Sequence, residues 1–231
     1  MSLTLASYNI HRCYGQDGHY QPHRIRRVLR ELNAQVIALQ EVELLHDAPG
    51  LLEFFCDDSH LTAIPGLTLT REAGHYGNAL LTSLPILSVR RIDLSMPGRE
   101  PRGALFVTLE YGKKPIVIIA THLGLRPAER RAQIKLLLST LEDEEKTVKQ
   151  ATMTVLMGDL NEWFLWGRPL RWLRKYFNPS PAPASFPVFL PVLALDRIWI
   201  KPARKIRHVK TLRNRDTRIA SDHFPLLAEI V

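Results

Sequence analysis

The strongest constraint on the fold is a series of short apolar runs that each stop at a polar residue. The run TMTVLMGD (152–159) is apolar and rich in β-branched residues until Gly158, and then delivers Asp159 and, two positions later, Asn161. Such a run is typical of a buried strand. Asp and Asn are also good helix-cap residues, so this stretch alone leaves open a strand followed by a capped helix.

Helical patterns alternate with these strands. Residues 22–34 (PHRIRRVLRELNA) and 126–143 (RPAERRAQIKLLLSTLED) repeat apolar residues at helical spacing, and Pro22 stands near the start of the first. The pairs expected to form hairpins are the strands at 78–83 and 85–94, interrupted at Pro85, and those at 103–111 and 114–123. Interleaved helices, strands and hairpins predict an α/β (α+β) sandwich with mixed sheets, in a single domain over residues 1–231.

Composition places the chain among ordinary globular proteins. Its 231 residues are 45% hydrophobic and 23% charged. No apolar run reaches 18 residues, so we expect no transmembrane segment, and the N-terminus lacks the pattern of a secretory signal. Two cysteines, Cys13 and Cys56, without a CxxC pair argue against a disulfide framework or zinc knuckle. We expect a cytoplasmic monomer, with peripheral binding at the membrane left open.

Positive charge is concentrated in one part of the chain. The net charge is +8, but residues 162–218 hold 13 Lys or Arg against three acidic residues. This surplus predicts a polyanionic partner such as nucleic acid, anionic lipid or a phosphate ester, unless it is a solvated basic face. We expect the following residues to capture substrate: Arg204, Lys205, Arg207 and Lys210. Three of the four tryptophans lie in 162–175. Two interpretations are open: they are core residues of a helix that covers the sheet, or they form a rim beside the site that stacks bases or enters lipid.

The polar residues at the strand ends are the candidates for chemistry. They are Asn9, Glu41, His122, Asp159, Asn161, Asp196, Asp222 and His223. Singly, most have an ordinary interpretation as turn residues or structural histidines, but Asp196 interrupts an apolar strand and needs a partner, because an unpaired buried carboxylate is costly. If the strands share one sheet edge, these side chains converge. Carboxylate and amide oxygens suit Mg²⁺ or Mn²⁺ rather than zinc, and the remaining groups can serve as acid, base and charge stabilisers.

Seven segments appear in the order seen in one known superfamily. They are YNIH, ALQEVE, YGNALLTSLPI, THLGL, GDLNEW, LDRIWI and SDHFPLL. Over residues 5–231 the chain thereby resembles the endonuclease/exonuclease/phosphatase superfamily, and most of all its small bacterial members of uncertain substrate. The resemblance implies a deoxyribonuclease-I-like four-layer sandwich, two packed mixed β-sheets flanked by helices, with the site at one end of both sheets.

The resemblance also implies an activity and a role for each residue. The activity is a Mg²⁺-dependent phosphodiesterase or nuclease-type hydrolase, with Mn²⁺ as a substitute, which cleaves a P–O ester of nucleic acid or of a phospholipid-like substrate by in-line attack of water. The implied metal ligands are Asn9, Glu41 and Asp222. The implied catalytic residues are Asp159 and Asn161 at the water, His223 held by Asp196, and His122 near the leaving group. Asn78 and Arg102 are implied phosphate contacts. The alternative is a catalytically silent polyanion- or membrane-binding module on the same fold.

Overall fold

Two β-sheets form the centre of the molecule. The computed structural model describes residues 2–46, 50–147, 151–202 and 206–231. The first sheet has the order β10 (Ile206–Thr211), β11 (Leu226–Ile230), β1 (Leu3–Asn9), β2 (Val36–Leu45), β4 (Gly74–Thr82) and β3 (Thr62–Arg71). The second has the order β5 (Ile86–Asp93), β6 (Gly103–Tyr111), β7 (Lys114–His122), β8 (Met153–Asp159) and β9 (Asp196–Lys201). Both sheets are mixed, since β1–β2 and β7–β8 are parallel pairs and the other pairs are antiparallel.

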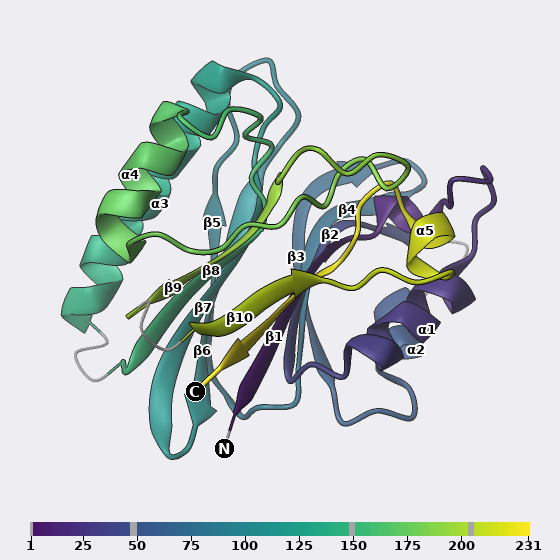
Figure 1. Ribbon diagram of the computed structural model, residues 1–231, viewed down its shortest axis with the longest axis horizontal. Coiled ribbons are helices and arrows are strands. Elements are labelled where there is room, and N and C mark those ends of the chain that lie inside the picture. Colours follow the sequence, from purple (N-terminus) through teal and green to yellow (C-terminus); the bar gives the residue numbers. More distant parts are fainter. Residues whose placement is uncertain (1, 47–49, 148–150, 203–205) are drawn as a thin grey trace.

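Helices cover the outer face of each sheet (Figure 1). Helices α3 (Pro127–Thr147) and α4 (Arg168–Phe177) lie on the second sheet, whereas α1 (Pro22–Leu32), α2 (Leu51–Cys56) and the short α5 (Thr217–Ala220) lie beside the first. A 3₁₀ turn, η1 (His11–Cys13), follows β1. One hydrophobic cluster fills the space between the sheets and two others lie beneath the helices. The predicted four-layer sandwich is confirmed.

Local sequence explains why α1 forms where predicted. Pro22 occupies the first turn, where its missing N–H would have no intrahelical partner, and Asn33 closes the helix in the left-handed conformation. Ile25, Val28, Leu29 and Leu32 are buried against the first sheet. Within the described ranges, no helix has both the length and the apolar content needed to cross a bilayer.

One expected strand pair is wrong. The strands on either side of Pro85 do not form a hairpin, because β4 belongs to the first sheet and β5 to the second. The chain therefore passes from one sheet to the other at this proline. The edge strands β3 and β10 were not expected from the sequence. Strand β3 contains Pro65, which an edge strand tolerates because one side of its backbone needs no partner.

Candidate active site

Strand register brings three predicted residues into one row. In the parallel pair β7–β8, His122 lies directly opposite Asp159, and in the antiparallel pair β8–β9, Asp159 lies opposite Asp196. Residues paired in this way share a face of the sheet. Gly158 precedes this row with φ +144°, and a Cβ there would overlap the carbonyl oxygen of Thr121. Only glycine therefore allows β8 to approach β7 this closely.

The first sheet contributes Asn9 and Glu41 from neighbouring strands. Asn9 ends β1, whereas Glu41 lies on a β-bulge, where the register between β2 and β4 shifts between Leu39 and Val42. Glu41 has φ +56°, and the two bulged residues, Gln40 and Glu41, oppose Asn78 alone. Bulges redirect side chains and are common beside active sites. Here the bulge turns the Glu41 carboxylate toward Asn9, whose Nδ2 donates to Glu41 Oε1 at 3.1 Å.

The Asp159 carboxylate is the meeting point of the two sheets. Its Oδ2 accepts a hydrogen bond from Asn9 Nδ2 at 3.2 Å and lies 3.6 Å from His122 Nε2 and 3.7 Å from His223 Nε2. Its Oδ1 accepts the backbone N–H of Asn161 at 2.8 Å. Burial raises the pKa of Asp159 to about 6, while the nearby His223 limits the rise. The carboxylate is thus held from several sides in a buried position.

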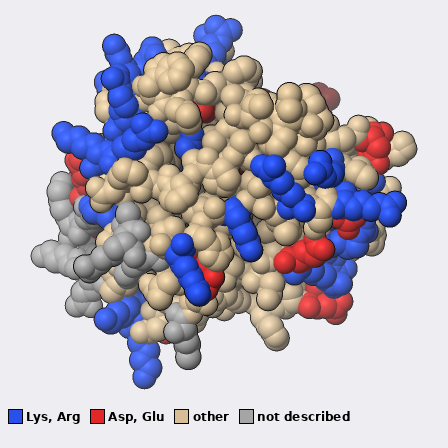
Figure 2. Space-filling model, viewed as in Figure 1, with Lys and Arg blue, Asp and Glu red and all other residues tan. Residues whose placement is uncertain are grey.

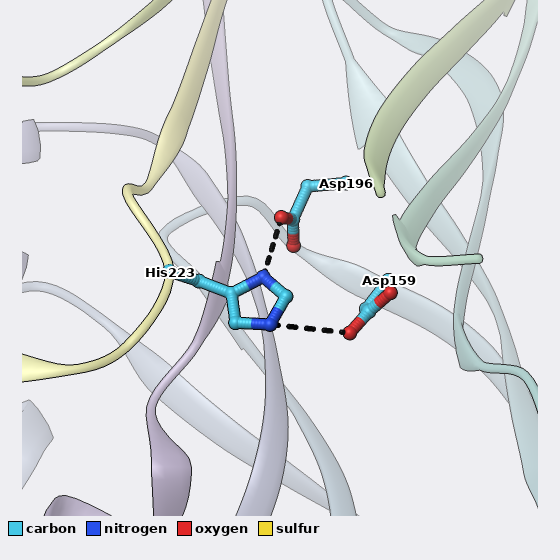
Figure 3. Close-up of side chains that lie close together, drawn as sticks. All are labelled: Asp159, Asp196 and His223. Atoms are coloured by element: carbon cyan, nitrogen blue, oxygen red, sulfur yellow. Dashed lines mark hydrogen bonds and ion pairs between the residues drawn. The ribbon is translucent and has the colours of Figure 1, made fainter. Parts of the chain in front are cut away.

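His223 lies between two carboxylates (Figure 3). Its Nδ1–H donates to Asp196 Oδ2 at 2.7 Å, and the Ser185 hydroxyl donates to the same oxygen at 2.5 Å. Burial lowers the pKa of His223, but Asp196 and Asp159 outweigh it and raise the pKa to about 10. At neutral pH the ring is therefore an imidazolium, and Asp196 has the partner that its place in an apolar strand demands.

His122, unlike His223, is in a setting that favours the neutral ring. Its Nδ1 lies 3.1 Å from Arg102 Nη1, and its Nε2 lies 3.0 Å from Asn161 Nδ2. Two nitrogen donors facing the ring disfavour a protonated imidazole. Burial, followed by the charges of Arg102 and His223, holds the pKa of His122 well below its usual range. The site thus pairs one charged histidine with one neutral histidine.

These groups line one cleft of about 360 Å³. Seven of the predicted site residues reach its wall: Glu41, Arg102, His122, Asp159, Asn161, Asp222 and His223. The other predicted residues, Asn9, Asn78 and Asp196, are buried behind the wall. Asn78 Nδ2 donates to the Gly103 carbonyl at 3.2 Å, so this side chain joins the two sheets beside Arg102.

Comparison with known proteins identifies the family of this chain. The model of the Endonuclease/Exonuclease/phosphatase family matches residues 6–223. The chain belongs to this family. It is 31% identical to the uncharacterised protein YbhP of Escherichia coli (strain K12) over 227 aligned positions, which cover 89% of this chain and 87% of the relative.

Solved structures share the family fold. The endonuclease/exonuclease/phosphatase from Bacteroides vulgatus superposes with a TM-score of 0.79 at 17% identity, covering 100% of this chain and 99% of that one. TDP2 from D. rerio, solved in complex with a single-strand DNA product, superposes with a TM-score of 0.72 at 14% identity, covering 100% and 99%. At these identities the likeness shows the fold alone.

Members of this family generally depend on a divalent metal, and two groups of residues are candidates to hold one here. Asp159, Asp196 and His223 have ligand atoms within 4.8 Å of one another. However, His223 Nδ1 and Asp196 Oδ2 already bond each other at 2.7 Å, so two of these three groups are engaged with one another. Glu41 and Asp222 present carboxylates to the cleft, with the Asn9 amide beside Glu41. This all-oxygen set fits a hard cation better than the histidine cluster does.

Some residues of this family site were not predicted. Ser185, which bonds Asp196, lies in the proline-rich stretch PSPAPASFPVF, where the sequence offers no signal. Tyr76 and Trp163 line the cleft, and they are the first residue of YGNALLTSLPI and the last of GDLNEW, two of the quoted segments. Of the three tryptophans in 162–175, Trp163 and Trp166 are 57% and 72% exposed, so the core alternative is wrong for these two. Trp172, in α4, is half-buried against the core beneath the helices.

Of the four basic residues predicted to capture substrate, the structure describes Arg207 and Lys210, and Lys210 lies opposite Leu227 in the pair β10–β11. Arg204 and Lys205 lie outside the described residues. Arg207 is the second residue of the edge strand β10 and follows Ile206, which lies opposite Ile230 at the end of the sheet where both termini lie. Its Nη1 pairs with Glu229 Oε1 at 2.9 Å. The cleft lies at the opposite strand ends, so Arg207 is poorly placed to capture substrate there.

Proposed function

We propose that the protein is a divalent-metal-dependent phosphodiesterase that cleaves a P–O ester by in-line attack of water, without a covalent intermediate. The observation that carries this proposal is the Asp159 carboxylate in the cleft wall, held by Asn9 and Asn161 and facing the His223 imidazolium. Membership of the endonuclease/exonuclease/phosphatase family supports the reaction class.

Asp159 orients the attacking water and accepts its proton. A pKa of about 6 leaves the carboxylate ionised at neutral pH and close to the value that favours proton transfer. The backbone N–H of Asn161 fixes Oδ1, and the Asn161 side-chain amide donates to the Leu123 carbonyl at 2.9 Å. These bonds limit rotation of the carboxylate, and such positioning is a large part of phosphoryl-transfer catalysis.

His223 stabilises the negative charge that develops on the phosphate. Its Nδ1–H is committed to Asp196, so its Nε2–H is the donor available toward the cleft. The Arg102 guanidinium, also in the cleft wall and ion-paired with Glu100 at 3.1 Å, supplies a second donor of fixed position. His122, neutral and beside Arg102, stands near the leaving group. Donors fixed before the reaction lower the barrier because they need no reorganisation.

A divalent cation fits the carboxylate side of the cleft. Glu41, Asn9 and Asp222 would hold Mg²⁺, with Mn²⁺ as a substitute. When bound, it supplies Lewis-acid neutralisation of phosphate charge. Asn78 supports the wall beside Arg102 through its bond to the Gly103 carbonyl.

The test is hydrolysis of bis-p-nitrophenyl phosphate by the metal-stripped protein with and without added Mg²⁺ or Mn²⁺. We expect turnover with either metal, its loss with EDTA, and a fall of about 10²–10⁴-fold in Asp159→Asn. Asp58→Asn, which changes a carboxylate whose side chain is 79% exposed, is the matched control and should retain full rate. No metal-dependent turnover by the folded wild type would favour the alternative, a silent polyanion-binding module.

A parallel panel separates substrate classes. It holds single- and double-stranded DNA, abasic DNA, RNA, sphingomyelin, cardiolipin and inositol phosphates. Nucleic acids are included because the chain shares its fold with TDP2 from D. rerio, which was solved with a single-strand DNA product. Phospholipids are included because large apolar side chains are exposed beside the cleft.

A further inference from the structure

Three segments at the mouth of the cleft expose large apolar side chains. They are Leu125 in the loop after β7, residues 163–166 in the loop after β8, and residues 189–192 before β9, which together we call the apolar rim. Leu125, Trp166 and Phe189 are 69%, 72% and 77% exposed. Clusters of exposed apolar side chains on a soluble protein mark interaction sites. Because Leu125 and Trp163 also line the cleft, a partner bound to the apolar rim would lie directly against the cleft as well.

A buried arginine holds the first two segments together. Arg130 Nε donates to Glu162 Oε2 at 3.1 Å, and its Nη1 donates to the Leu125 carbonyl at 2.5 Å. Glu162 Oε1 in turn accepts the backbone N–H of Phe164 at 3.2 Å. A Cβ at Gly167 would lie 2.7 Å from the Glu162 carboxyl carbon, so this loop packs tightly on its support. The exposed side chains are therefore presented by a fixed scaffold.

The third segment is the tip of a short hairpin anchored at the site. The backbones of Phe186 and Leu193 bond each other in both directions, at 3.1 and 2.9 Å. The ring of Phe186 lies against His223, with centroids 4.7 Å apart. The base of the hairpin is thus part of the cleft wall, while Phe189, Leu190 and Val192 at its tip are exposed.

Positive charge adjoins the rim. Helix α4 starts two residues after Trp166, and its exposed positions are all basic, namely Arg168, Arg171, Arg174 and Lys175. The helix contains no acidic residue. Figure 2 shows Lys and Arg side chains gathered over α4. Apolar side chains that enter the acyl boundary beside basic side chains that meet headgroups are the two features of an interfacial anchor.

We propose that the apolar rim and the basic face of α4 dock the protein on an anionic membrane surface, with the cleft against the bilayer. Single-stranded nucleic acid fits less well, because base stacking uses aromatic platforms, whereas Leu125, Leu165, Leu190 and Val192 are exposed aliphatic side chains. If the proposed phosphodiesterase function holds, the substrate it meets there is a headgroup phosphodiester. That consequence rests on the proposed function; the docking does not.

The docking test is flotation of the full chain with vesicles of phosphatidylcholine, with and without 30% phosphatidylglycerol, in EDTA so that no hydrolysis intervenes. We expect binding to the anionic vesicles that weakens with salt. Trp166→Ser with Phe189→Ser should lower the partition coefficient at least about tenfold, and so should Arg171→Glu with Lys175→Glu. Unfolding temperatures report on folding.

Matched controls lie at the far end of the second sheet. Leu87, 53% exposed on β5, and Lys113 and Lys114, exposed at the β6–β7 turn, are distant from the cleft along the strands. Leu87→Ser and Lys113→Glu with Lys114→Glu should bind vesicles like wild type. Wild type that does not float with anionic vesicles, or rim variants that bind like wild type, would overturn the proposal. Rim variants that lose a single-stranded oligonucleotide but keep vesicle binding would overturn it in favour of base stacking.

Discussion

Asp196→Asn tests how the site holds its charged histidine. Asp196 is fully buried, and its Oδ2 accepts from both Ser185 and His223, whereas its Oδ1 has no hydrogen-bond partner among the described residues. Asparagine keeps the shape and can place its amide oxygen at the Oδ2 position. The negative charge is then lost, and a buried NH₂ group stands where Oδ1 was, without an acceptor.

The size of the effect follows from these contacts. A hydrogen bond to a charged group contributes ~1.5–3 kcal/mol, and one pKa unit corresponds to about 1.4 kcal/mol. The pKa of His223 should therefore fall from about 10 by roughly 1–2 units. The unsatisfied amide should lower the free energy of unfolding by ~1–3 kcal/mol. The rate on a small diester should fall mainly above about pH 8, because His223 is still protonated at neutral pH but loses its proton at lower pH than in the wild type.

The assay is an NMR titration of the His223 ring in EDTA, combined with urea unfolding at several pH values. Because the folded pKa lies above the ordinary value of 6.5, the stabilisation from protonated His223 is complete below pH 6.5 and is lost as pH rises through about 10. Ser185→Ala is the control, since it removes one bond to the same oxygen and keeps the charge. It should cost ~0.5–1.5 kcal/mol of stability and not lower the pKa of His223. An unchanged His223 pKa in Asp196→Asn would refute this reasoning.

Three further variants test other parts of the site. Glu41→Gln should raise the metal concentration for half-maximal activity at least ~10-fold, because a carboxylate ligand is lost, and should leave the unfolding temperature unchanged. A variant that needs no more metal than the wild type would exclude Glu41 as a ligand. Gly158→Ala should lower the free energy of unfolding in urea by ~2–6 kcal/mol through backbone strain and overlap with Thr121, and a loss below 1 kcal/mol would contradict the close strand approach. Asp159→Asn combined with His223→Ala should slow turnover little more than either single change, since groups that act as one unit do not add, whereas multiplicative losses would show independent action.

Where the pattern is local, sequence and structure agree closely. The amphipathic repeat at 22–34 becomes α1 (Pro22–Leu32), and the apolar run at 152–159 becomes a strand in which every residue from Met153 to Asp159 is buried. The row of His122, Asp159 and Asp196 follows from strand ends brought into register. Burial of Asp196 could be inferred from its apolar neighbours, and so could its need for a partner.

The remaining features depend on contacts between distant segments. The sequence around Ser185 carries no sign that its hydroxyl meets Asp196. Tryptophan-rich segments usually enter cores, but Trp163 and Trp166 lie on a loop that Glu162 and Arg130 hold outside the sheet packing. The surplus of basic residues in the sequence also does not show on which part of the surface each basic side chain lies. Helix α4 carries its basic face beside the rim, whereas β10 carries Arg207 to the other end of the sheet.

The most direct test of the central claim is where oxygen from water appears in the products. Bis-p-nitrophenyl phosphate is hydrolysed with Mg²⁺ in ¹⁸O-enriched water, and both products are analysed by mass spectrometry. Attack of water at phosphorus, as proposed for the Asp159 site, puts one ¹⁸O into p-nitrophenyl phosphate and none into p-nitrophenol. Label in p-nitrophenol, or turnover that Asp159→Asn does not reduce, would contradict it.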